Sequence, residues 1–453
     1  MKYLFSKRSK TGLTKRTISL LSVLFLCSCN GTQTLKKASF YPHESKGVYS
    51  PYVFSLNDAS LKPPLPSLHE EDPNFINYIN VLVIPISFDG RDLSKDEIAY
   101  LHNGPVAKFY SVNDILKENS NGKCLIRFAI ADTVREKRPA KFDPYAFPSD
   151  FLPRWLKENE KYYPIEKFDS DNSGGYDCVI LEDVSKEPYI QVNGYYPPNI
   201  DKVDGLCLIE AIDPGIIAHE IGHALGLPDT YETYIEEEDA KEFHLPCGGA
   251  FTMDGAKHCF TDYEKWLLNW STPQFFDPSK LEYTLSKENP SLFFPAKEDS
   301  MSPYEEYLCF SYYDSTNRYS PTILSEGDQI GVYISHTDGR LYDTEKKEFV
   351  SAPSKNVTWA FDNTREGKVK GISHHPQQWV LKKGDFSDYD TYETLPSKEP
   401  YLRTQDVLFS EGDTFNPNKD YLFYGEDNSH TERFGYSVSF KEEDGKMKIK
   451  FCK

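Results

Sequence analysis

The sequence predicts an α+β domain over about residues 78–277 and an all-β, sandwich-like domain over 278–453. In the first part, continuous apolar runs that indicate buried strands alternate with helical patterns. From about Pro278 the pattern changes to short alternating segments separated by turn residues. That change is typical of antiparallel sheets that pack as a sandwich.

The α+β part opens with a β-branched run at residues 81–88, which predicts a strand buried on both faces. Two helical stretches follow, from about Ser94 and from about Pro105 to Glu118, and residues 120–123 predict a turn. Further strands are expected at residues 124–131, 178–181 and 206–209.

A helix after the last of these strands carries the residues that indicate chemistry. Asp213 suits its N-cap and Pro214 its first position. His219 and His223 are four residues apart, so both imidazoles lie on one face of this helix and can bind one metal ion. Glu220 lies beside them, where a carboxylate can serve as a general base toward a water on that ion.

The end of this helix suggests the third ligand. Gly226 favours a left-handed stop and Pro228 prevents continuation, so the chain must turn and can bring Asp229 toward the metal. The competing carboxylates follow Asp229 in the sequence: Glu232, Glu236 and Glu237. The acidic run that contains the last two also fits a solvated face. A surface helix with two solvated histidines is the alternative interpretation of the whole motif.

The pattern H-E-x-x-H-x-x-G-x-x-D resembles the metzincin clan of zinc peptidases. Within that clan, residues 219–231 with their Leu-Pro-Asp ending resemble the immune inhibitor A family of bacterial secreted metallopeptidases. The resemblance implies a mixed, twisted sheet with an active-site helix, a bound zinc ion and a methionine turn beneath it. Met253, in the stretch 249–255, fits that turn, although filling a gap in a core would explain it too. Residues 261–270 resemble the family's next helix.

The N-terminus indicates a leader rather than a folded segment. Residues 1–28 combine a basic region with an apolar run that is too short to span a bilayer. Leu26-Cys27-Ser28-Cys29 resembles a bacterial lipobox, which implies lipidation of Cys29 and a membrane anchor at the cell surface. A plain secreted leader and an uncleaved anchor are the alternatives. Residues 29–77 are polar and proline-rich, and they predict a tether or a short pro-segment.

Charge and cysteine content bound the partners of the chain. A formal net charge of −19 argues against nucleic acid, because phosphate binding needs clustered lysine and arginine. We expect a monomer that acts on a protein or peptide. Three cysteines in strand-like runs fit free buried thiols: Cys124, Cys178 and Cys207. Cys247 and Cys259 flank the expected methionine turn and could form a disulfide.

Two further features stay open at the sequence level. Asp169, Asp171 and Asp177 lie in a glycine-containing loop that could bind Ca²⁺, although the loop lacks the glutamate of a complete calcium motif and a polar turn explains it equally well. His336 with Asp338, and the pair at 374–375, have no partners at ligand spacing, so we expect structural or solvated side chains. Near the C-terminus, Asp444-Gly445 between two alternating runs predicts a hairpin.

Taken together, these features predict a lipid-anchored zinc endopeptidase with Glu220 as general base. Two other functions remain open. The chain could be a surface binding or adhesion lipoprotein whose peptidase site has decayed, or a zinc hydrolase that acts on something other than peptides.

Overall fold

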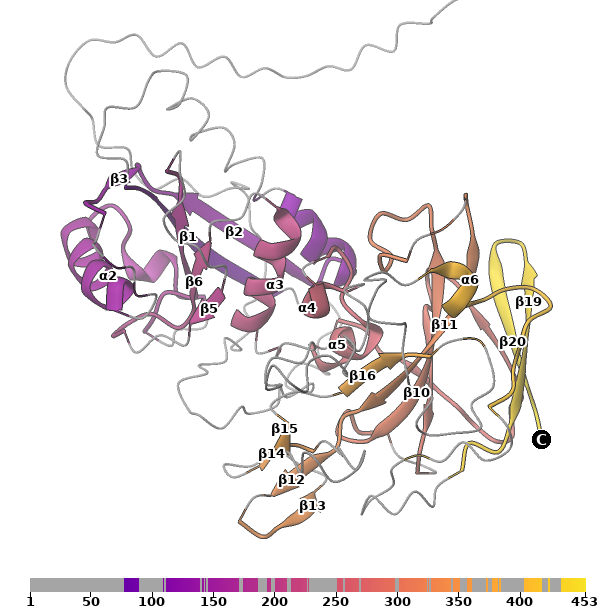
Figure 1. Ribbon diagram of the computed structural model, residues 1–453. Helices are drawn as coiled ribbons and strands as arrows, with labels where there is room; N and C mark the ends of the chain where they lie inside the picture. Colours follow the sequence, from indigo (N-terminus) through magenta and orange to yellow (C-terminus); the bar gives the residue numbers. More distant parts are fainter. Residues whose placement is uncertain are drawn as a thin grey trace, which may run out of the picture. The chain divides into compact units, whose positions relative to one another are not determined.

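The computed structural model describes residues 77–88, most of 109–227 and most of 251–453 (Figure 1). Residues 1–76, 89–108, 228–250 and 384–402 lie outside the described part, together with shorter segments. The chain divides into two compact units, Met1–Lys36 and Lys37–Lys453, and every described residue belongs to the second. The leader, the tether and the helix expected from about Ser94 therefore lie outside the described residues. None of the helices within the described residues is long and apolar enough to cross a membrane.

The first sheet is parallel except at one edge. Its strand order is β2-β1-β4-β6-β5, with β3 paired to β1 beyond the end of β2, and only β5 runs antiparallel to its neighbour. Its strands are β1 (Asn77–Ser87), β2 (Cys124–Ile130), β3 (Val134–Arg135), β4 (Cys178–Asp183), β5 (Gly194–Tyr196) and β6 (Leu206–Ile209). The four strands expected from apolar runs are thus confirmed. β1 begins earlier than expected, because Asn77 to Asn80 pair with β2.

Alternate residues of β1 enter two different apolar cores, as the two-residue period of a strand requires. Val81 and Val83 belong to a core that also contains α3 (Pro214–Ala224) and the helix over residues 111–119. Leu82 and Ile84 belong to a second core with α2 (Ala146–Asn159). A short 3₁₀ turn, η1 (Ile165–Lys167), follows α2. The sheet is therefore covered by helices on both faces.

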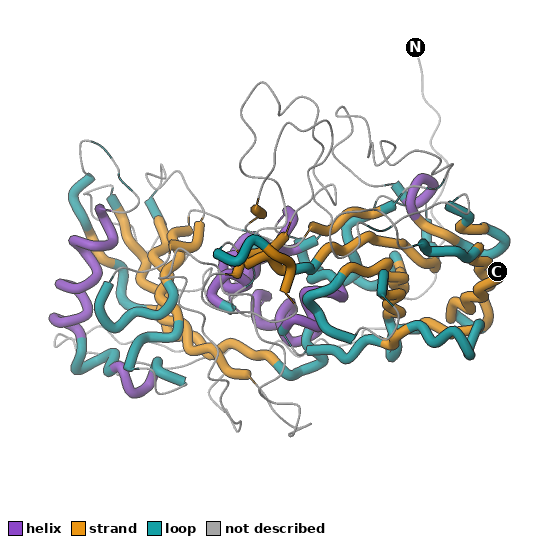
Figure 2. The backbone as a smooth tube through the Cα atoms, turned by 90° about the horizontal axis from the view of Figure 1, so that it is seen from below, coloured by secondary structure: helices purple, strands orange, loops and turns teal. Residues whose placement is uncertain are grey.

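The second half of the described chain is mostly strand, in contrast to the first (Figure 2). One sheet has the order β16-β11-β10-β9-β7 with β17 paired to β11, a second has the order β18-β19-β20-β8, and a third the order β13-β12-β14-β15. The strands of the first are β7 (Gln274–Phe275), β9 (Ser291–Pro295), β10 (Glu306–Asp314), β11 (Ile330–Asp338), β16 (Gln377–Val380) and β17 (Leu408–Phe409). Those of the second are β8 (Glu282–Leu285), β18 (Thr414–Phe415), β19 (Ser437–Glu443) and β20 (Lys446–Cys452). Those of the third are β12 (Leu341–Asp343), β13 (Glu348–Val350), β14 (Val357–Ala360) and β15 (Ile372–Ser373).

The first two of these β sheets share one apolar core. Leu308 and Ile334 from one sheet and Val438 and Ile449 from the other lie in the same buried cluster. The hairpin expected at Asp444-Gly445 is confirmed, since β19 pairs with β20 and both turn residues have positive φ angles, 53° and 72°.

Packing is continuous between the two halves of the described chain. Phe293 and Tyr307 of the β sheet belong to the same buried cluster as α3 and α5 (Asp262–Leu267). Tyr263 of α5 donates a hydrogen bond to the carbonyl oxygen of Pro303 at 2.5 Å. The remaining short helices are α4 (Thr252–Gly255) and α6 (Thr404–Val407).

Candidate metal centre

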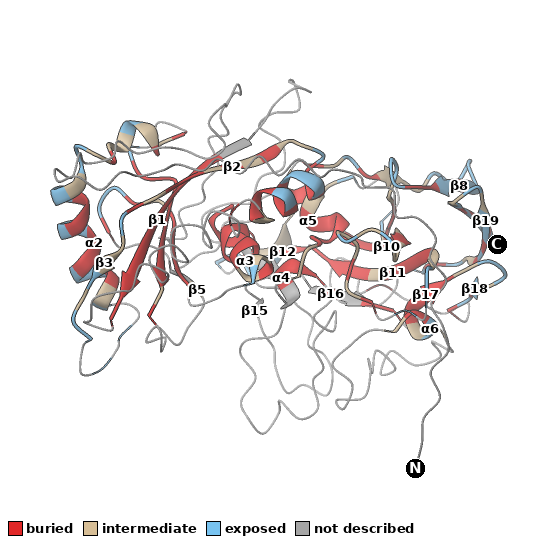
Figure 3. Cartoon of the chain, turned by 90° about the horizontal axis from the view of Figure 1, so that it is seen from above, coloured by how far each residue is buried: buried red, intermediate tan, exposed pale blue. Residues whose placement is uncertain are grey.

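The helix that carries the motif begins where its sequence predicts. Asp213 is the N-cap, its Oδ1 accepts a hydrogen bond from the backbone of Gly215 at 2.7 Å, and Pro214 occupies the first helical position. The helix is buried along most of its length (Figure 3). It ends at Ala224 with Leu225 as C-cap, and the glycine expected to stop it, Gly226, lies outside the described residues.

Backbone carbonyl groups fix the orientation of both histidine rings. The Nδ1 atom of His219 lies 2.8 Å from the carbonyl oxygen of Thr252, and that of His223 lies 2.7 Å from the carbonyl oxygen of Leu227. A carbonyl oxygen can only accept, so each Nδ1 must carry the proton. Each Nε2 then presents its lone pair, which is the form that binds a metal ion.

The two coordinating atoms face each other. The Nε2 atoms of His219 and His223 are 3.1 Å apart and both rings are buried. Two nitrogen ligands at about 2.05 Å from a tetrahedral zinc ion would be separated by about 3.3 Å. Two lone pairs this close repel each other unless a cation or a shared proton lies between them, so the donor set fits a metal ion.

Glu220 completes the group. Its side chain is buried, and one carboxylate oxygen and the two histidine nitrogens all lie within 4.8 Å of one another. Within the part of the chain that the structure describes, this is the one set of three such residues close enough to hold a metal ion. A carboxylate at this position can exchange a proton with a molecule bound next to the two Nε2 atoms.

Met253 packs directly against the helix between the two histidines. It is fully buried on α4, and a Cβ atom at Gly222 would lie 2.5 Å from its sulfur. The same α4 contains Thr252, whose carbonyl oxygen holds His219. The position of Met253 fits both the expected turn and a core-filling role, and the turn remains a prediction.

The described residues include none of the other candidate zinc ligands. Asp229 lies outside the described residues, as do the competing carboxylates at 232, 236 and 237. The third ligand therefore remains a prediction.

In the proposed calcium loop, the described aspartates accept hydrogen bonds from backbone amides. Both carboxylate oxygens of the buried Asp177 accept backbone hydrogen bonds, from Ser170 at 2.6 Å and from Asn80 at 2.8 Å. Asp169 accepts from the backbone of Gly174 at 2.9 Å, and Asp171 lies outside the described residues. Asp177 thus links the loop to β1 by hydrogen bonds. Calcium binding remains a prediction.

The cysteines agree only in part with expectation. Cys124, Cys178 and Cys207 are free buried thiols, as predicted. Cys259 is also a free buried thiol, which speaks against the disulfide suggested with Cys247; Cys247 itself lies outside the described residues. Its sulfur instead contacts the carbonyl oxygen of Phe260 at 3.2 Å.

His336 and Asp338 of β11 are buried structural residues, and each pairs with a different side chain. His336 Nε2 lies 2.7 Å from a carboxylate oxygen of Glu306, and both side chains are about 1% exposed. Asp338 forms a two-point ion pair with Arg340. The histidine pair at 374–375 lies outside the described residues.

Sequence reasoning missed the residues that surround the histidines. Thr252 and Leu227 act through backbone carbonyl groups, which every residue has, so no sequence signal marks them. Gly222 was a visible signal, because a glycine inside a helix costs about 1 kcal/mol relative to alanine and its presence there needs a packing reason. The T-x-x-E pattern of Thr261 and Glu264 was another, and it forms a complete capping box at α5.

Comparisons with known proteins do not place this chain in a family. No family model and no curated protein matches it. Among solved structures, a chain described as "Structure of a chaperone-substrate complex" matches at 17% identity over 35% of this chain and 25% of that chain, with a TM-score of 0.23. The chain thus spans about a quarter of that structure. Wild-type OgpA from Akkermansia muciniphila matches at 12% identity over 69% of this chain and 97% of that chain, also with a TM-score of 0.23. Similarity at this level supports no conclusion about fold or function.

Proposed function

We propose that this chain is a zinc endopeptidase that hydrolyses peptide bonds of protein substrates outside the bacterial cell. The observation that supports the proposal best is the pair of Nε2 atoms, 3.1 Å apart, whose rings are both held by backbone carbonyl groups through Nδ1. His219 and His223 would hold the ion and Asp229 is proposed as the third ligand. We also propose, from the motif, that the chain is a member of the metzincin clan and related to the immune inhibitor A family.

A zinc ion in this site would supply a Lewis acid that polarises the scissile carbonyl group and lowers the pKa of a water molecule. The protein residues would supply the rest. Glu220 takes a proton from the attacking water and delivers it to the leaving amine. Nδ1 of each histidine keeps its proton and its hydrogen bond to the backbone carbonyl oxygen, so the rings hold their orientation throughout.

The edge of the first sheet offers a place for an extended substrate. β5 is its antiparallel edge strand and it contacts α3. Among the described residues β5 pairs only with β6. We propose that a substrate peptide adds to this edge by backbone hydrogen bonding, which would pass it beside the helix that carries Glu220.

Replacing Glu220 tests the chemistry separately from metal binding. Glu220→Ala should keep zinc and lose about 10²–10⁴-fold in turnover, because a general base is worth that much and is not a ligand. Peptidase activity on a protein substrate is measured with and without a chelator. A variant that keeps more than about a hundredth of the wild-type turnover would refute the role of Glu220.

Zinc content of purified variants tests the ligands. His219→Ala, His223→Ala and Asp229→Ala should each lose the ion, while Glu236→Ala serves as the matched control and should retain it. Full zinc occupancy in the Asp229 variant would remove that residue from the ligand set. Wild-type protein that binds zinc but cleaves no protein would instead favour a binding lipoprotein with a decayed site or a zinc hydrolase that acts on something other than peptides.

A further inference from the structure

One segment after the metal-site helix links His219 to a distant part of the fold. The carbonyl oxygen of Thr252 accepts a hydrogen bond from Nδ1 of His219 at 2.8 Å. Its backbone amide donates to the carbonyl oxygen of Cys259 at 2.7 Å, and its hydroxyl group donates to that of Lys257 at 3.0 Å. The position of the His219 acceptor therefore depends on where residues 257–260 are held.

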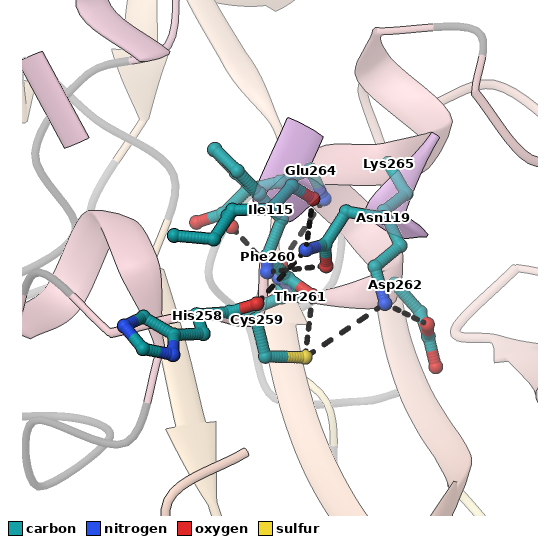
Figure 4. Close-up of polar contacts among 9 residues, drawn as sticks. All are labelled: Ile115, Asn119, His258, Cys259, Phe260, Thr261, Asp262, Glu264 and Lys265. Atoms are coloured by element: carbon teal, nitrogen blue, oxygen red, sulfur yellow. Dashed lines mark hydrogen bonds and ion pairs between the residues drawn. The ribbon is translucent and has the colours of Figure 1, made fainter. Parts of the chain in front are cut away.

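The side-chain amide of Asn119 forms hydrogen bonds with the backbone on both sides of Cys259. Asn119, the last residue of the 111–119 helix, accepts from the backbone amide of Phe260 at 3.0 Å and donates to the carbonyl oxygen of His258 at 2.9 Å (Figure 4). Its second amide proton goes to the carbonyl oxygen of Ile115 at 2.8 Å. The Asn119 side chain is buried, so water cannot easily replace these bonds.

We propose that Asn119 is a positioning residue for the metal centre. The path runs from its amide group through the backbone at 258–260 to Thr252 and then to His219. Asn119 lies 139 residues before His258 in the sequence, so the clip joins two separate parts of the chain. This inference rests on the proposed function, because it assigns a role relative to a metal bound by His219.

The chemistry of the site requires an asparagine. The position needs one acceptor and two donors in one plane, which is the inventory of a primary amide. An aspartate would keep the acceptor but would place an oxygen about 2.9 Å from the carbonyl oxygens of His258 and Ile115. An alanine would leave all three backbone groups without this partner. Removing a group that hydrogen-bonds directly to a metal-binding histidine typically changes metal affinity by 10–100-fold, and Asn119 acts on His219 indirectly, through Thr252.

The same helix supplies a matched control. Asn113 is also buried, and its Oδ1 accepts from the backbone amide of Ile126 at 2.9 Å, so it joins the helix to β2. This hydrogen bond leads to β2 and not to residues 251–260. Asn113→Ala therefore removes a comparable buried hydrogen bond without touching the path to His219.

The test compares zinc affinity across these variants by competition with a chromophoric chelator. Asn119→Ala and Asn119→Asp should raise the Kd for zinc by about 10-fold, the low end of the range for a direct partner of a ligand, while Asn113→Ala should leave it near the wild-type value. The free energy of unfolding is measured in chelator on the same samples, so that general destabilisation is compared directly. Asn119 variants that bind zinc as tightly as Asn113→Ala would overturn the proposal.

A second measurement separates this proposal from the proposed function. NMR of protein labelled with ¹⁵N-histidine reports, without metal, whether His219 carries its proton on Nδ1. Wild type and Asn113→Ala should show that tautomer, and Asn119→Ala should lose it. Wild type that shows the tautomer but binds no zinc would refute the metal site, while the effect of Asn119 on the orientation of His219 would still stand. Retention of the tautomer in both Asn119 variants would refute the positioning role.

Discussion

Adding one methyl group to α3, at Gly222, should reveal how tightly Met253 is packed against this helix. In Gly222→Ala the new Cβ atom would lie 2.5 Å from the sulfur of Met253 and 3.3 Å from a ring carbon of Phe260. Nonbonded heavy atoms prefer about 3.5–4.0 Å, so the sulfur must retreat by roughly 1 Å. Met253 is fully buried, which leaves it little room to do so.

The magnitude follows from two opposing effects. Overpacking of a buried site costs about 1–3 kcal/mol, whereas alanine in place of glycine inside a helix stabilises by about 1 kcal/mol. We therefore expect a net loss of about 0–2 kcal/mol from Gly222→Ala. In a Met253→Ala background the steric conflict disappears and only the helical gain remains. The effect of the Gly222 substitution should thus change sign, with a coupling free energy of about 1–3 kcal/mol between the two sites.

Guanidinium unfolding of the four proteins in a double-mutant cycle measures this coupling. Tryptophan fluorescence is a suitable signal because Trp266 and Trp270 lie in the same buried core as Met253. A chelator in every sample keeps metal binding out of the comparison. If the two substitutions are additive within about 0.5 kcal/mol, Met253 does not press on Gly222 and the proposed packing beneath the histidines is wrong.

Two further predictions concern the N-terminus and the β sheets. Cys29→Ser should move the protein from the membrane fraction to the soluble fraction, because the proposed lipid is attached to the thiol. Incorporation of a fatty-acid analogue measures this, and label that persists on the serine variant would place the anchor elsewhere. Arg340→Met should cost about 3–5 kcal/mol of unfolding free energy at pH 7, because Asp338 would remain buried without its cation. Burial already raises the pKa of Asp338, and loss of Arg340 raises it further, so the protonated carboxyl group is the form that the folded variant tolerates. The deficit should therefore shrink as the pH falls from 7 through the pKa of Asp338; a deficit that stays constant from pH 7 down to the acid limit of the folded state would contradict this.

Local features of the sequence determined the parts of the fold that depend on neighbouring residues. The helix start at Asp213, the hairpin at Asp444 and the strand before Ser87 were all predictable, because capping, turn geometry and apolar runs act over a few residues. The same holds for the relation between His219 and His223, since a spacing of four residues in a helix places both on one face. α2 was not predicted; Pro153 lies inside it, where proline normally interrupts a helix, and tertiary packing of Phe151 and Trp155 overrides that tendency.

The tertiary structure alone decided how the histidines are held. Their proton positions depend on backbone carbonyl groups of Thr252 and Leu227, and a carbonyl group gives no sign of its role in the sequence. Asn113 and Asn119 look alike as polar residues of one helix, yet only Asn119 bonds to residues 258 and 260. The physical reason is that one-dimensional patterns record which face of an element is buried. The partner of a buried donor or acceptor is chosen only when segments far apart in the chain come together.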